Sequence, residues 1–201
     1  KVGLIGTIEV IIGDKVIKSL NTTPESYVLQ EYFAQMVEEG CDCVVMEVSS
    51  QGLMLHRVAG VVFDYAVFSN LSPDHIGPNE HKDFEDYKRC KGMLFKQSKI
   101  GIINIDDKYA QEVIEGHTCQ IETFGFSEEA DLRAENMKLM DPSEGMGVEY
   151  DVKGIMDFHV RVNIPGKFSV YNSLTTIAVA RHFGISEDII NKQLLKATIK
   201  G

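Results

Sequence analysis

The alternation of apolar and polar positions predicts an α/β protein. Three short apolar runs, at residues 42–48, 65–70 and 99–104, are rich in valine, isoleucine and aromatic residues, as is typical of strands buried in a parallel sheet. A segment of helical periodicity at residues 83–96 separates the last two. This rhythm predicts a mostly parallel, doubly wound sheet flanked by helices.

The first 40 residues predict a hairpin followed by a helix. The run at residues 1–12 indicates a strand or the start of a hairpin, with a turn at Gly13 and Asp14. In the next segment, Thr23 is expected to cap a helix, Pro24 to occupy its first position and Gly40 to end it.

The last third of the chain predicts a different arrangement. Residues 131–164 alternate with a period of two, which indicates a small antiparallel extension of the sheet, with turns at residues 141–142 and 153–154. Two helices follow, the second capped by Ser186. We expect one domain over residues 1–201, and both ends resemble cuts through a longer polypeptide.

The composition excludes several classes of protein. With 201 residues, 44% hydrophobic and 25% charged, the chain is typical of a folded globular domain. Its net charge of -10 and the lack of a basic cluster argue against nucleic acid as a partner. No apolar stretch reaches the length of a membrane span and no signal peptide is visible, so a cytoplasmic location is expected. The four cysteines are expected to be reduced.

Two polar residues lie at or shortly after the ends of predicted strands. Glu47 lies in residues 46–57 (MEVSSQGLMLHR) and His75 in residues 68–77 (FSNLSPDHIG). Because parallel strands end at one edge of a sheet, we expect the two side chains to meet there. A carboxylate at that place suits Mg²⁺, whereas imidazole does so only beside carboxylates. The alternatives are a buried ion pair for Glu47 and a surface position for His75.

Lys91 falls within an apolar helical stripe, formed with Phe84, Tyr87 and Leu94. A buried ammonium is costly, so this lysine is expected to reach solvent, pair with an anion or lose its proton as desolvation lowers its pKa. The alternative is a lysine at the margin of the stripe, covering apolar surface with its methylene groups.

Other polar residues have weaker patterns. Residues 21–23 precede a helix, where backbone N–H groups favour an anion, although a simple cap explains Thr23. Arg57 could clamp a phosphate or carboxylate, or form a surface pair. The polar residues at 104–107 are interpreted as turn formers, and no phosphate-binding loop motif occurs. The remaining histidines show no pattern: His56, His81, His117, His159 and His182.

Several ordered motifs together resemble the central, ATP-binding domain of the Mur ligase family, and within it the MurE branch. They run along almost the whole chain in the family's order: NTTPE, MEVSS followed by HR, SNLSPDH, YKRCKGMLF, NIDD and PGKFSVYNSL. The order of so many motifs is more specific than any one of them.

The resemblance implies a set of site residues. Glu47, His75 and a carbamoylated Lys91 would bind Mg²⁺ and serve catalysis. Five further residues would hold the UDP-muramoyl dipeptide: Asn21, Thr22, Thr23, Ser49 and Arg57. Phe168 and Asn172 would lie beside the adenine of ATP.

The resemblance also implies an activity. The parent protein would use ATP to add a diamino acid to UDP-N-acetylmuramoyl-L-alanyl-D-glutamate through an acyl phosphate, in peptidoglycan synthesis. The family's phosphate-binding loop and its amino- and carboxy-terminal domains would lie outside these residues, so the fragment alone is expected to be inactive. The alternatives are a ligase similar to folylpolyglutamate or cyanophycin synthetase, and a non-catalytic binding module of the same fold.

Overall fold

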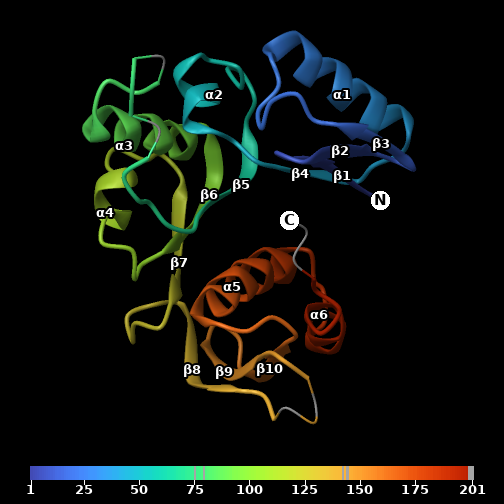
Figure 1. The fold of residues 1–201 in the computed structure, drawn as a ribbon, viewed down its shortest axis with the longest axis vertical. Coiled ribbons are helices and arrows are strands. Elements are labelled where there is room, and N and C mark those ends of the chain that lie inside the picture. Colours follow the sequence, from blue (N-terminus) through green and yellow to red (C-terminus); the bar gives the residue numbers. More distant parts are fainter. Residues whose placement is uncertain (75, 79, 142, 144, 199–201) are drawn as a thin grey trace. The chain divides into compact units, whose positions relative to one another are not determined.

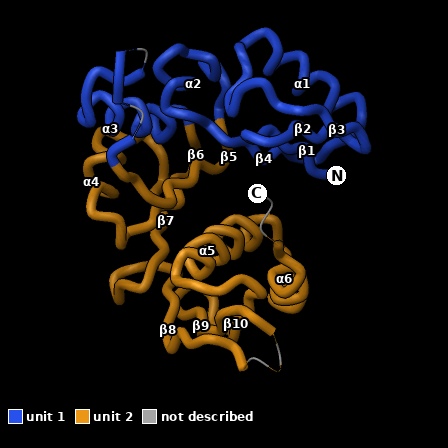
Figure 2. Tube along the Cα trace, in the orientation of Figure 1, with its two compact units in different colours: residues 1–62, 73–97 blue, residues 63–72, 98–201 orange. Residues whose placement is uncertain are grey.

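The computed structural model describes the chain except residues 75, 79, 142, 144 and 199–201 (Figure 1). The chain folds into two compact units, coloured separately in Figure 2. Unit 1 comprises residues 1–62 and 73–97, and unit 2 comprises residues 63–72 and 98–201. Each unit has its own sheet and its own helices, so each is described by itself.

Unit 1 contains a four-stranded mixed sheet. Its order is β3-β2-β1-β4, made by β1 (Val2–Ile5), β2 (Glu9–Ile12), β3 (Lys15–Lys18) and β4 (Cys43–Met46). The first three strands form antiparallel pairs, and β4 pairs parallel with β1. Gly13 adopts a left-handed backbone with φ of 59° between β2 and β3, which confirms the predicted turn.

Helix α1 (Ser26–Glu38) covers one face of this sheet with Leu29 and Met36. A side-chain carbon added at Gly3 would lie 2.5 Å from the sulfur of Met36, so a larger residue there would displace the end of this methionine side chain. Gly40 ends the helix as predicted, with φ of 69°, and the N–H of Cys41 bonds to the carbonyl of Met36 at 2.9 Å.

Two expectations for this region were wrong. Helix α1 begins at Ser26 with Glu25 as its N-cap, so neither Thr23 nor Pro24 has the predicted position. Strand β4 is not buried on both faces, because Val45 is 57% exposed and Val44 is also exposed. The apolar run predicted the strand correctly, whereas its burial depends on what covers the sheet. Among the described strands, β4 has β1 as its single neighbour.

The rest of unit 1 is helical. Helix α2 (Ser50–Met54) follows β4 and was not predicted, and it packs against α3 (Phe84–Gly92). A short 3-10 helix, η1 (Met93–Lys96), continues α3. Asp83 caps α3 by accepting the N–H of Asp86 at 2.7 Å.

Unit 2 contains a six-stranded sheet that curls at one end (Figure 1). Its order is β10-β9-β8-β7-β6-β5, made by β5 (Phe63–Phe68), β6 (Ser98–Asn104), β7 (Gln120–Gly125), β8 (Leu132–Leu139), β9 (Val148–Gly154) and β10 (Phe158–Val162). Strands β5 to β8 are parallel, and β8 to β10 form the predicted antiparallel extension. The predicted α/β class is confirmed, with the strands divided between this sheet and the smaller mixed one.

Helices α5 (Lys167–His182) and α6 (Glu187–Leu194) pack on this sheet, and α4 (Ala110–Val113) connects β6 to β7. The core of the unit joins Ile102 and Phe124 of the parallel strands to Leu174 and Ile177 of α5. Within the described part of the chain, every helix is too short or too polar to cross a membrane. All four cysteines are free thiols, as predicted.

Candidate functional site

The carboxylate of Glu47 lies just past the end of β4 and is held in a fixed orientation. The backbone N–H of Glu47 donates to the carbonyl of Ile5 at 2.8 Å, which extends the pairing of β4 with β1 by one residue. The Thr7 hydroxyl and N–H both donate to Glu47 Oε2, at 2.5 and 3.3 Å. The same hydroxyl contacts that of Thr22 at 3.0 Å. An exposed carboxylate is thus oriented by a neighbouring loop at the edge of the sheet.

Thr23 connects the residue before α2 to the end of β4. Its hydroxyl accepts the N–H of Ser49 at 2.8 Å and donates to the carbonyl of Glu47 at 3.2 Å. Ser49 in turn caps α2 by accepting the N–H of Gly52 at 3.0 Å. A side-chain carbon at Gly52 would lie 2.7 Å from Thr23 Cγ2, so the helix approaches this threonine closely. The hydroxyl of Thr23 is therefore engaged here, which explains why it does not cap α1.

Arg57 reaches back to the segment before α1. One guanidinium nitrogen donates to the carbonyl of Thr23 at 3.1 Å, and another pairs with the Glu25 carboxylate at 2.6 Å. The arginine side chain is 16% exposed, whereas that of Glu25 is 62% exposed. Of the two interpretations of Arg57, the structure shows the ion pair, and a contact with substrate stays a prediction.

The structure thus brings together four of the residues expected to bind the dipeptide substrate. Thr22, Thr23, Ser49 and Arg57 form one hydrogen-bonded network with Glu47, all within unit 1. The fifth, Asn21, is exposed and adjacent in sequence. His75 lies outside the described residues, so its predicted proximity to Glu47 stays a prediction.

Lys91 lies in the apolar stripe as expected. Its side chain is half-buried, and Nζ lies 5.7 Å from the centre of the Tyr87 ring. Desolvation lowers the pKa of this amine below its ordinary value. A lowered pKa increases the neutral fraction at a given pH, and the neutral amine is the form that can attack CO₂.

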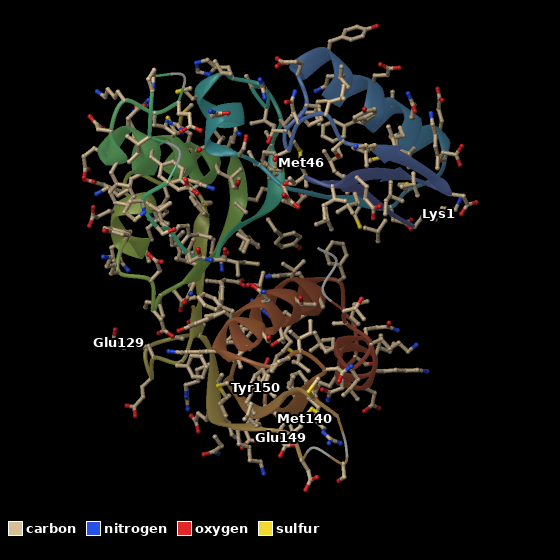
Figure 3. The ribbon with its side chains drawn as sticks, viewed as in Figure 1. Lys1, Met46, Glu129, Met140, Glu149 and Tyr150 are labelled. Atoms are coloured by element: carbon tan, nitrogen blue, oxygen red, sulfur yellow. The ribbon has the colours of Figure 1, made fainter. Side chains whose placement is uncertain are left out.

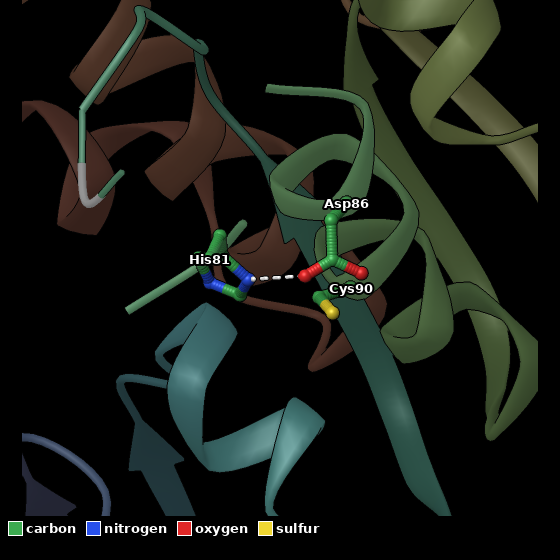
Figure 4. A group of neighbouring side chains, drawn as sticks. All are labelled: His81, Asp86 and Cys90. Carbon is green, nitrogen blue, oxygen red and sulfur yellow. Dashed lines mark hydrogen bonds and ion pairs between the residues drawn. The ribbon is translucent and has the colours of Figure 1, made fainter. Parts of the chain in front are cut away.

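Sequence reasoning missed a buried cluster centred on His81 (Figure 4). The ring is 0% exposed; Nε2 lies 2.8 Å from Ser50 Oγ and Nδ1 lies 3.3 Å from Asp86 Oδ2. Cys90 lies in the same group. No local sequence signal indicates His81, because it lies in a loop with neither helical nor strand periodicity. The nearby N-cap of α3, Asp83, is the part of this region that the sequence could have indicated.

Unit 2 contains a pocket of about 140 Å³ at the carboxyl ends of β5 and β6. Its lining combines strand-end residues with the first turns of α5: Ser69, Asn70, Asn104, Asp106, Asp107, Phe168, Tyr171 and Asn172. Phe168 is 74% exposed, which leaves apolar surface available to stack on a planar group. Both residues expected beside the adenine, Phe168 and Asn172, therefore line one pocket.

Hydrogen bonds hold several side chains that line this pocket. The Asp106 carboxylate accepts the N–H groups of Phe126 and Ser127 at 2.6 and 3.0 Å and the Tyr171 hydroxyl at 2.9 Å. Asn104 Oδ1 accepts the N–H of Asp106 at 3.1 Å. Burial and the adjacent Asp106 raise the pKa of Tyr171, which keeps its hydroxyl protonated as a donor. Asn104, Asp106 and Asp107 form a turn, as expected, and they also line the pocket.

Solved structures define the class of fold. A UDP-N-acetylmuramoyl-L-alanyl-D-glutamate–2,6-diaminopimelate ligase is similar over 100% of this chain and 41% of its own, with a TM-score of 0.84 and 23% identity. Mycobacterium tuberculosis folylpolyglutamate synthase, complexed with ADP and AMPPCP, is similar over 88% of this chain and 41% of its own, with a TM-score of 0.64 and 15% identity. The chain has the fold that these ligases share.

Sequence similarity then identifies the family. Residues 1–180 match the Mur ligase middle domain, and the chain belongs to this family. The 2,6-diaminopimelate ligase 1 of Clostridium acetobutylicum is 48% identical over 98% of the chain and 40% of the relative, and the ligase of Caldanaerobacter subterraneus is 45% identical over 100% and 41%. The chain thus spans about 40% of the length of these curated relatives.

Proposed function

We propose that these residues are the central part of an ATP-dependent ligase that adds a diamino acid to UDP-N-acetylmuramoyl-L-alanyl-D-glutamate. The observation that carries this proposal is the 48% identity, over 98% of the chain, to a relative named for that reaction. The printed names of the relatives specify 2,6-diaminopimelate, which is therefore the diamino acid that we favour. Because ATP and a UDP-linked precursor are the reactants, we place the enzyme in the cytoplasm, in peptidoglycan synthesis.

The proposed reaction has two steps. The γ-phosphoryl group of ATP is transferred to the free carboxylate of the D-glutamyl residue, which gives an acyl phosphate and ADP. The amine of the diamino acid then attacks the acyl carbon, an amide bond forms and inorganic phosphate leaves. Phosphoryl transfer of this kind depends mainly on positioning and charge stabilisation, so the protein must hold its reactants rigidly.

The residues of unit 1 suit a hard cation. Glu47 supplies a carboxylate that Thr7 orients, and Lys91 supplies a desolvated amine that a carbamate would convert into an oxygen ligand. Oxygen ligands are those that Mg²⁺ prefers, and the ion, when bound, would offset charge between phosphate oxygens. We propose Glu47, His75 and carbamoylated Lys91 as the protein's share of this site.

The UDP-muramoyl dipeptide and ATP are proposed to bind to separate groups of residues. Asn21, Thr22, Thr23, Ser49 and Arg57 would hold the UDP-muramoyl dipeptide, with hydroxyl and guanidinium donors suited to its anionic groups. The pocket in unit 2 would hold the adenine of ATP, stacked on the exposed ring of Phe168 and contacted by the amide of Asn172.

Three alternatives remain, on different grounds. A ligase similar to folylpolyglutamate synthetase has the same fold, since the M. tuberculosis enzyme gives a TM-score of 0.64, but its identity is 15% against the 48% of the diaminopimelate ligase. A cyanophycin synthetase-like ligase rests on the family resemblance alone. A non-catalytic module would need neither the oriented carboxylate of Glu47 nor the desolvated amine of Lys91.

An assay of the complete gene product tests the proposal. The purified protein is expected to release ADP and form the tripeptide when it has ATP, Mg²⁺, the UDP-muramoyl dipeptide and meso-diaminopimelate. Lys91→Ala in the same protein is expected to lower turnover at least about 100-fold with little change in far-UV circular dichroism, because the oxygen ligand from the carbamate is lost. Residues 1–201 alone are expected to form no product.

The outcomes separate the alternatives. Product with folylpolyglutamate precursors, and none with the muramoyl dipeptide, would reassign the enzyme within the fold class. Product with lysine in place of diaminopimelate would correct the diamino acid. The absence of any ATP-dependent ligation by the complete, folded protein would favour the non-catalytic module.

A further inference from the structure

We propose that His81 is a positioning residue that joins the three segments carrying the proposed cation ligands. The inference rests on the proposed function, since it concerns the site formed by Glu47, His75 and Lys91. His81 is 0% exposed, so it cannot act on a substrate directly. Both of its ring nitrogens and its backbone take part in contacts with other segments of unit 1.

The first segment is the one that carries Glu47. His81 Nε2 lies 2.8 Å from the hydroxyl of Ser50, which is itself 3% exposed and is the first residue of α2. The helix has five residues, so few contacts of its own can hold it in place. Thr23 bonds both the N–H of Ser49 and the carbonyl of Glu47. The His81–Ser50 contact therefore fixes the end of the segment whose other end bears Glu47.

The second segment is α3, which carries Lys91. His81 Nδ1 lies 3.3 Å from one carboxylate oxygen of Asp86, whose other oxygen accepts from Arg89 at 2.8 Å. The His81 ring also lies 5.2 Å from that of Tyr87, the ring over which the Lys91 ammonium is placed. The imidazole thus contacts the same face of α3 that presents the lysine.

The third segment is the loop that follows residue 75. Ile76 and His81 form an isolated parallel bridge, and the N–H of Gly77 donates to the carbonyl of His81 at 3.2 Å. These contacts hold Ile76 and Gly77 against His81, which is buried. His81 therefore contacts residues that are near each of the three proposed ligands in the sequence.

A metal ion bound by His81, Asp86 and Cys90 is the rival explanation of this cluster. Their ligand atoms lie within 4.8 Å of one another, and such a mixed set would suit Zn²⁺. However, the Arg89 guanidinium already donates to Asp86 at 2.8 Å and to Cys90 Sγ at 3.3 Å. The Arg89 guanidinium thus already supplies the positive charge beside Asp86 and Cys90, so the positioning role is favoured over metal binding.

Variants of the complete ligase test the proposal with a readout other than activity. The affinity for Mn²⁺, a spectroscopic substitute for Mg²⁺, is measured by electron paramagnetic resonance in His81→Ala, His81→Gln and Ser50→Ala. His81→Ala and Ser50→Ala are expected to weaken Mn²⁺ binding about 10- to 100-fold, as is typical when a residue supporting metal ligands is lost. The amide of glutamine can reach the position of Nε2, so His81→Gln should recover much of the affinity.

Tyr150→Phe is the matched control. It removes a buried hydrogen bond, from the Tyr150 hydroxyl to Ser173 at 2.7 Å, in the core of unit 2. It is expected to lower the melting temperature while Mn²⁺ affinity stays unchanged. Ser50→Ala removes a single hydroxyl group, so it provides the test if His81→Ala does not fold.

The outcomes distinguish this inference from the proposed function. Glu47→Gln is measured in parallel and is expected to lose Mn²⁺ binding. If it does, and Ser50→Ala and His81→Ala bind Mn²⁺ within about twofold of the wild type, the positioning role is wrong and the proposed site stands. If Glu47→Gln also binds Mn²⁺ normally, the proposed cation site itself is wrong. A stoichiometric zinc ion that is lost in Cys90→Ser would replace positioning by metal binding.

Discussion

At the scale of single residues, unit 1 places a lysine where its charge is disfavoured. Lys91 is half-buried beside the Tyr87 ring of α3, and desolvation lowers its pKa. A lysine in such surroundings usually costs stability, so its presence needs a reason other than packing. The proposed carbamate supplies one, because it converts the disfavoured amine into a ligand for a cation.

The pH dependence of stability measures this cost. Below the folded-state pKa both states are protonated and the folded chain bears the whole desolvation penalty. As the pH rises from there towards the unfolded value of about 10.4, the folded amine loses its proton first and the penalty is relieved. Lys91→Met is therefore expected to raise the melting temperature of residues 1–201 at neutral pH, by an amount that shrinks as the pH approaches about 10.

The measurement is thermal unfolding in CO₂-free buffer across that pH range. Lys82→Met, at an exposed position on the preceding loop, is the matched control and should show no such trend. A stabilisation by Lys91→Met that is the same at every pH would mean that added apolar contact, and not relief of a desolvated charge, is responsible.

At the scale of elements, buried hydroxyl groups hold short helices and strand ends in place. Helix α2 has five residues and begins directly after the segment that carries Glu47, so its position depends on tertiary hydrogen bonds. Thr23, 1% exposed, provides two of them, one to the N–H of Ser49 and one to the carbonyl of Glu47. A single side chain thereby connects the start of one element to the end of another.

Thr23→Val should break this connection while keeping the shape of the side chain. The variant leaves the part-buried N–H of Ser49 and the carbonyl of Glu47 without their partner, which is expected to destabilise the chain by about 1–3 kcal/mol. Thr23→Ser keeps the hydroxyl and should lose less. Urea unfolding of the two variants measures the difference, and a larger loss in Thr23→Ser than in Thr23→Val would show that the methyl group packed against Gly52, and not the hydroxyl, carries the effect.

At the scale of the whole molecule, the strands differ in how completely they are paired. In unit 2, β6 lies between β5 and β7 and its residues from Gly101 to Asn104 are buried. In unit 1, β4 pairs with β1 alone among the described strands, and two of its four residues are exposed. A strand with one neighbour leaves half of its backbone groups open to solvent.

Hydrogen exchange should follow this difference. The amides of β6 are expected to exchange slowest, through global unfolding, and those of β4 at least about 100-fold faster, through local opening. Exchange of residues 1–201 followed by mass spectrometry or NMR provides the rates. Equal protection of the two strands would show that β4 is covered in solution, by a second copy of the chain or by another partner.

The sequence by itself determined the features that depend on near neighbours. The turn at Gly13, the end of α1 at Gly40 and the period-two strands of the extension all follow from glycine conformation and from the spacing of apolar residues along a few turns or pleats. Lys91 could be placed in an apolar stripe for the same reason. The ordered motifs also indicated the family.

The tertiary structure alone decided the features whose partners are distant in sequence. The hydroxyl of Thr23 was expected to cap α1, but it bonds residues 24 and 26 positions further along the chain. His81 had no local signal, because one of its partners, Ser50, lies 31 positions away. The burial of β4 also could not be predicted, because an apolar residue is buried only when another element covers it. Hydrogen bonds and burial are properties of what surrounds a residue in space, and only the fold sets those surroundings.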